Sequence, residues 1–105
     1  MGGSLEMFRE VAQMFASDAP KLVAELRRAA RSGDCIGLAT AAHSLRGALG
    51  YVGARAPGRL ALKLEELGKA GNLAEARQEF EALAEQMARL DESLSLFVAA
   101  RETAG

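Results

Sequence analysis

Apolar residues recur along the first third of the chain at intervals of three and four. This stripe comprises Leu5, Phe8, Ala12, Phe15, Ala19, Leu22 and Leu26. Such spacing places apolar side chains on one face of a helix. Ser4 is a suitable N-cap, and the stripe keeps its phase across Pro20. We therefore expect one bent helix from just after Ser4 to about Arg31.

The segment Ser32-Gly33-Asp34 then ends this helix and caps a second, which we expect over about residues 35–52. Residues 53–57 form a break, and Pro57 suits the first turn of a third helix, which ends within 68–71.

Asn72 opens a fourth helix through a sequence close to a capping box. Its apolar stripe comprises Ala76, Phe80, Leu83, Met87, Leu90, Leu94 and Phe97. Four amphipathic helices with short connections predict an all-α fold, an antiparallel four-helix bundle formed by residues 1–105 as a single domain. The start of the chain, residues 1–4, resembles sequence added to an excised domain rather than part of the bundle.

The second predicted helix carries the one histidine of the chain, His43. At about 100° per residue, its core stripe lies some 220° from His43 and comprises Leu38, Ala42, Leu45, Leu49 and Val52. His43 therefore points toward the surface. Its neighbours on the helical wheel are Ile36, Ala39, Thr40, Arg46, Gly47 and Gly50.

Two of these neighbours, Gly47 and Gly50, are glycines inside a helix, where each costs about 1 kcal/mol relative to alanine. We interpret them as positions where another surface approaches His43, although a tight helix crossing is the alternative. Gly37 lies on the flank that faces the core, where close packing is the better explanation.

The chemistry of this face suits a phosphoryl group. Imidazole is a neutral nucleophile near pH 7, and Arg46, one turn from His43, can neutralise an anion held there. Ile36, Ala39, Thr40, Gly47 and Gly50 would give a smooth, partly apolar docking surface.

The run Ala42-His43-Ser44-Leu45-Arg46-Gly47-Ala48, followed by Val52-Gly53-Ala54, resembles the signature of histidine-containing phosphotransfer domains. That signature reads A-H-x-L-K-G-x, then an apolar residue, a glycine and a small residue. The chain departs from it at Arg46, where the family has lysine. Arginine keeps the charge with a different geometry, so phosphate stabilisation should survive while transfer rates change.

The resemblance implies a phosphorelay carrier, cytoplasmic, either free-standing or the C-terminal module of a hybrid sensor kinase. His43 would accept a phosphoryl group, on the nitrogen farther from the backbone, from a receiver-domain aspartate and pass it to another. Arg46 would stabilise the phosphoryl oxygens, Gly47 would admit the receiver's loops, and Glu65 would orient the imidazole. For Glu65 a merely solvated position is the alternative.

The charge distribution and the cysteine content bear on other classes of function. Residues 1–63 carry nine basic and five acidic side chains, and residues 64–105 carry four and nine. This asymmetry indicates either solvated helix faces or a basic face that meets an acidic partner. Without an overall basic excess or a recognisable module, nucleic-acid binding is not expected. Cys35 is the one cysteine of the chain, so an internal disulfide is excluded. We expect Cys35 to be a packing residue and not a reactive thiol.

Neither a signal peptide nor a span of about 20 apolar residues is evident, so we expect no direct membrane contact. The domain is expected to be a monomer, to hold no metal or other cofactor, and not to be an autonomous kinase, because it lacks a nucleotide-binding loop. Phosphoryl transfer usually requires magnesium, which the partner receiver would supply. Two alternatives stay open: a docking module that is not phosphorylated, and a metal or cofactor bundle.

Overall fold

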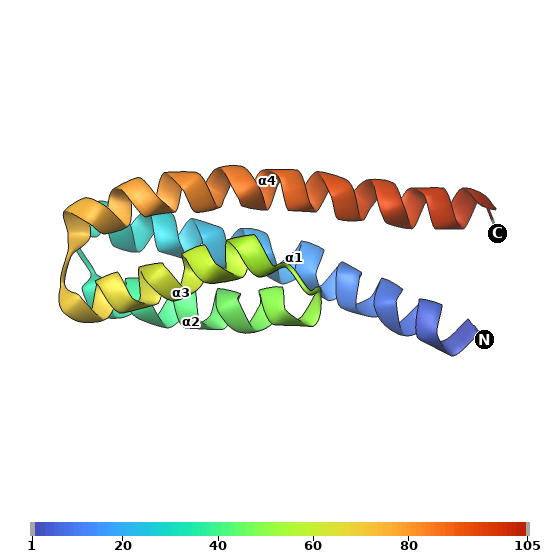
Figure 1. Cartoon of the computed structure of the whole chain (residues 1–105), viewed down its shortest axis with the longest axis horizontal. Helices are drawn as coiled ribbons and strands as arrows, with labels where there is room; N and C mark the ends of the chain where they lie inside the picture. The colour runs from blue at the N-terminus through green and yellow to red at the C-terminus, as the bar shows by residue number, and fades with distance from the viewer. Residues whose placement is uncertain (1, 105) are drawn as a thin grey trace.

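The apolar stripes pack together in four antiparallel helices (Figure 1). In this computed structural model, which describes the backbone of residues 2–104 and the side chains of residues 6–96, the elements are α1 (Gly2–Ser32), α2 (Cys35–Tyr51), α3 (Arg55–Ala70) and α4 (Leu73–Ala104). No strand occurs within this backbone. The predicted all-α antiparallel bundle is confirmed.

The long helices α1 and α4 extend together past the short pair α2 and α3, and both termini lie at that end (Figure 1). α1 runs unbroken through Pro20 as one helix, as predicted. Its predicted start is wrong, because the helix begins at Gly2 and Ser4 lies inside it rather than at its N-cap.

Most of the predicted stripe residues of α1, α2 and α4 that the structure describes are buried, and the others, Phe8, Leu22, Val52, Leu90 and Leu94, are partly buried. The largest fully buried side chains are Leu26, Leu38, Leu45, Leu49, Leu64 and Leu83. Burying a leucine stabilises a fold by about 1.5–3 kcal/mol, so this layer supplies much of the driving force for folding. The side chains of Leu5 and Phe97, which the sequence also assigned to the core, lie outside the described residues.

Three short turns join the helices, and each contains a glycine in the left-handed region, Gly33, Gly53 or Gly71. The Asn72 side chain accepts a hydrogen bond from the Glu75 backbone N–H at 3.3 Å, so the predicted cap of α4 is confirmed. Pro57 lies in the first turn of α3, as expected.

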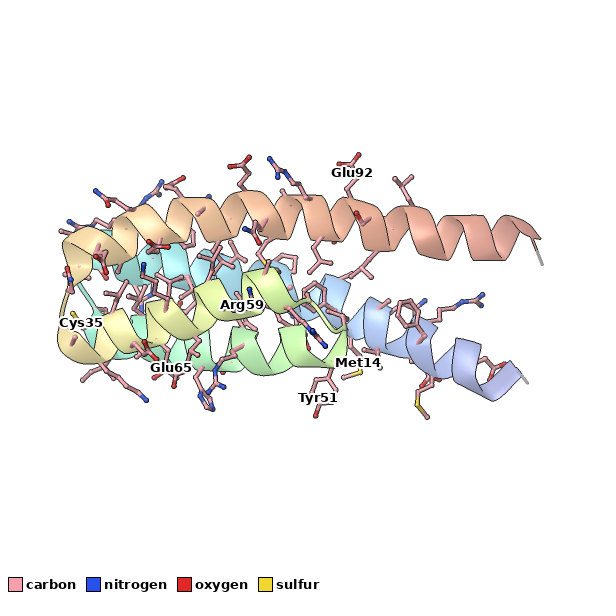
Figure 2. All side chains as sticks on the ribbon, viewed as in Figure 1. Met14, Cys35, Tyr51, Arg59, Glu65 and Glu92 are labelled. Carbon is pink, nitrogen blue, oxygen red and sulfur yellow. The ribbon has the colours of Figure 1, made fainter. Side chains whose placement is uncertain are left out.

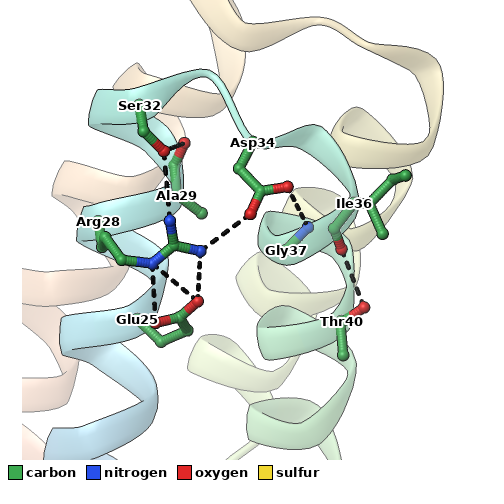
Figure 3. Close-up of polar contacts among 8 residues, drawn as sticks. All are labelled: Glu25, Arg28, Ala29, Ser32, Asp34, Ile36, Gly37 and Thr40. Carbon is green, nitrogen blue, oxygen red and sulfur yellow. Dashed lines mark hydrogen bonds and ion pairs between the residues drawn. The ribbon is translucent and has the colours of Figure 1, made fainter.

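Asp34 caps α2, and its carboxylate accepts the Gly37 backbone N–H at 2.8 Å (Figure 3). Arg28 bridges Glu25 and Asp34, and this contact holds the cap against α1. A Cβ at Gly37 would clash with the Asp34 carboxylate, so the close packing there arises from the cap itself.

α2 and α3 approach closely where Gly68 lies against the backbone of α2. A Cβ at Gly68 would lie 2.9 Å from the carbonyl oxygen of Cys35 and 3.0 Å from the backbone nitrogen of Ala39. This contact fixes the height of α3 relative to α2 and thereby places Glu65 beside His43. In the part of the chain that the structure describes, no helix is both long enough and apolar enough to cross a membrane.

Candidate phosphoryl-acceptor site

His43 lies on the outer side of α2, and its side chain is 65% exposed. On the opposite side of the helix, Leu38, Ala42, Leu45 and Leu49 are fully buried. The predicted exposure of His43 is therefore confirmed.

Glu65 from α3 is the buried partner of this ring. It is the one charged residue buried among the described side chains, with 7% of its side chain exposed. His43 Nδ1 lies 3.0 Å from Glu65 Oε2. Arg46 Nε donates to Glu65 Oε1 at 3.2 Å, and Lys69 Nζ lies 3.2 Å from Oε2. The alternative of a solvated Glu65 is thus wrong.

The protonation of this network follows from its charges. Burial alone would raise the pKa of Glu65, but the hydrogen bonds from Lys69 and His43 outweigh it and hold that pKa below its ordinary value. Glu65 is therefore a carboxylate at neutral pH, and a carboxylate only accepts hydrogen bonds.

The neutral His43 ring must then carry its proton on Nδ1, which donates to Glu65, and this leaves the lone pair on Nε2. Arg46 Nη2 also lies 3.3 Å from Nδ1. Both groups have only protons to offer in this tautomer, so that contact is not a hydrogen bond. It places the guanidinium beside the ring, where an anion would be held.

The glycines on this face are open. A Cβ built at Gly47 or at Gly50 would meet no atom within 4 Å. The tight helix crossing that was the alternative for these two residues is therefore wrong. The space beside His43 is free for another molecule.

Comparison with known protein families gives a match. The family model of the Hpt domain matches residues 10–93. This chain belongs to the Hpt domain family. No curated protein and no solved structure matches it. Hpt domains carry phosphoryl groups in two-component signalling, are not kinases, and interact with receiver domains.

In this Hpt domain the five residues predicted for docking are not equally accessible. Ile36 is 82% exposed, and Thr40, Gly47 and Gly50 are also exposed. Ala39 is only partly exposed, because the α3 backbone at Gly68 lies against it. The accessible part of the predicted docking surface is therefore formed by the other four residues of α2, and Ala39, on the side toward α3, contributes less to it.

A groove between α1 and α2 adjoins the histidine face on the other side. Its volume is about 610 Å³, and it is lined by Val11, Met14, Phe15, Asp18, Leu22, Ser44, Gly47, Ala48 and Tyr51. Met14 and Tyr51 lie near each other at its rim (Figure 2), and they are 64% and 82% exposed. Gly47 belongs both to the groove and to the face of His43, so the two surfaces are continuous.

Sequence reasoning missed the groove and Lys69. Lys69 follows Glu65 by four residues, a spacing that makes helical neighbours, so the pair could have been found once Glu65 was considered. The groove carries no comparable signal. Among the described side chains, no cluster of three or more His, Cys, Asp or Glu residues could hold a metal ion.

Proposed function

We propose that His43 is the phosphoryl acceptor of a phosphorelay, taking the group from one receiver-domain aspartate and passing it to another. The observation that carries the proposal is the pairing of His43 Nδ1 with the buried Glu65 carboxylate at 3.0 Å. An imidazole held in this way presents an Nε2 lone pair to solvent, beside the guanidinium of Arg46.

In the transfer step, Nε2 attacks the phosphorus of the aspartyl phosphate. The N–P bond forms as the bond between phosphorus and the aspartate oxygen breaks, and the aspartate leaves as a carboxylate. The positive charge that develops on the ring is stabilised through Nδ1–H by Glu65. The reverse sequence, with a second receiver, returns the domain to its starting state.

Arg46 has two roles in this proposal. Its Nε donates to Glu65, and its Nη2 lies beside the ring, where it can hydrogen-bond an oxygen of the transferred group. A guanidinium binds phosphate oxygens through two N–H groups at once, unlike the lysine of the family signature. The domain itself would then supply a nucleophile, one cation and a docking surface, and magnesium would come with the receiver.

The receiver would dock over the histidine face and the adjoining groove. The groove offers apolar area for binding, and the glycines allow the receiver's active-site loops to reach Nε2. Replacing Tyr51 with serine would remove an exposed aromatic ring at the rim of the groove. We expect weaker receiver binding and an unchanged rate of transfer within the complex.

We further propose that the domain acts in the cytoplasm as a monomer and without nucleic acid.

A two-receiver relay tests the proposed function. One receiver, phosphorylated with a small-molecule donor and freed of that donor, is mixed with the domain, magnesium and a second receiver. Phosphoryl groups should reach the second receiver only when the domain is present. Binding of receivers without transfer, across several receivers, would instead establish a docking module.

A further inference from the structure

We propose that Lys69 is a positioning residue of the acceptor site, which balances the charge of Glu65 so that Glu65 orients the His43 ring without favouring its doubly protonated form. This inference rests on the proposed function of His43. It adds Lys69 to the site, and it gives Lys69 the role of extending the pH range over which the site transfers phosphoryl groups.

The contacts place Lys69 inside the network. Lys69 Nζ lies 3.2 Å from Glu65 Oε2, the same oxygen that receives His43 Nδ1 at 3.0 Å. The two residues are four apart on α3, so helix geometry keeps them adjacent. Arg46 contacts the other oxygen, Oε1. Among the described residues these three side chains are the hydrogen-bond and ion-pair partners of Glu65.

A carboxylate beside an imidazole has two opposing effects. It fixes the tautomer, because it accepts the Nδ1 proton. It also favours the doubly protonated ring, and that ring has no lone pair with which to attack phosphorus. A site that uses Glu65 to orient His43 therefore needs positive charge nearby to offset the second effect.

Lys69 and Arg46 supply that charge from α3 and α2, the two helices that form the site. Lys69 is 68% exposed, so solvent screens its charge and the expected effect is modest. An exposed ion pair of this kind corresponds to a change of about two- to fivefold in an equilibrium.

The test measures the maximal rate of transfer from one phosphorylated receiver to the domain as a function of pH. In Lys69→Met the rate should begin to fall at a higher pH than in the wild type. The midpoint of that fall should shift upward by a few tenths of a pH unit, with rates two- to fivefold lower on the acid side. The plateau at high pH should be unchanged, because the ring is neutral there in both proteins.

Two variants serve as controls. Lys69→Arg keeps the charge and should restore the wild-type profile. Lys63→Met removes the other described α3 lysine, which is ion-paired with Glu79 of α4 at 3.0 Å, away from His43. Its profile should match the wild type.

The outcomes separate the two proposals. A wild-type domain that takes no label from any receiver tested overturns the proposed function. A labelled wild type whose profile coincides with that of Lys69→Met overturns only the role of Lys69. A Lys69→Met rate lowered equally at every pH, or a shift that Lys69→Arg does not reverse, also refutes charge balancing.

Discussion

Gly47 and Gly68 form a matched pair whose replacement by alanine should have opposite effects on stability. Both lie inside helices, so each replacement gains about 1 kcal/mol of helix propensity. At Gly47 the new methyl group meets no atom within 4 Å. Gly47→Ala should therefore stabilise the domain by up to about 1 kcal/mol.

At Gly68 the same methyl group would lie 2.9 Å from the Cys35 carbonyl oxygen and 3.1 Å from Ala39 Cβ. Ordinary contacts of this kind are 3.4–4 Å, and the obstructing atoms belong largely to the α2 backbone, which cannot rotate away. Overpacking of this kind costs about 1–3 kcal/mol. After the gain of about 1 kcal/mol in helix propensity, we expect Gly68→Ala to destabilise the domain by up to about 2 kcal/mol.

Thermal unfolding followed by circular dichroism at 222 nm measures both effects. For a domain of this size, 1 kcal/mol shifts the midpoint by about 4–8 °C, so the unfolding midpoints of the two variants should lie on opposite sides of the wild-type midpoint.

A bulky residue at Gly47 should affect phosphotransfer and not stability. Gly47→Gln should fold at least as stably as the wild type and lose phosphotransfer, because its side chain occupies the space that the receiver needs. A Gly47→Gln domain that unfolds, or that transfers normally, would refute this explanation of the glycine.

Three further predictions follow from the contacts. Arg46→Ala should slow transfer or shorten the lifetime of the phosphorylated domain without abolishing labelling, as measured by loss of the phosphoryl group over time. Leu45→Ala, in the fully buried layer behind His43, should destabilise the fold by about 2–5 kcal/mol in urea titrations. The hydrogen bonds from Arg28 and from the Gly37 N–H lower the pKa of Asp34, so its stabilising contribution is present above the ordinary pKa and is lost as the pH falls through the lowered one. Asp34→Asn keeps a capping oxygen without the charge, and its unfolding midpoint should fall less than that of the wild type between pH 5 and pH 2.

The sequence predicted the fold because the relevant signals are local. Leu45 and Leu49 recur at helical spacing with their neighbours, and that spacing alone determines which side of α2 is buried. Glycine at the turns, as at Gly71, similarly marks where a helix ends. The exposure of His43 followed from the same periodicity.

The site required information that no single helix contains. Whether Glu65 is buried beside His43 or solvated depends on the rotation and height of α3 relative to α2, which the Gly68 contact determines. The groove depends in the same way on how α1 and α2 are placed relative to each other, since both helices line it. These are tertiary relations, so periodicity could predict the face of His43 but not the network that holds its ring.

The central claim is that a phosphoryl group from a receiver is carried on His43. The most direct measurement incubates the domain with a phosphorylated receiver and magnesium and then determines the label and its chemical stability. We predict one phosphoryl group per domain, labile in acid and stable in base as a phosphoramidate is, no labelling by ATP alone, and no labelling of a normally helical His43→Gln variant. Labelling that persists in His43→Gln would place the phosphoryl group on another residue and contradict the claim.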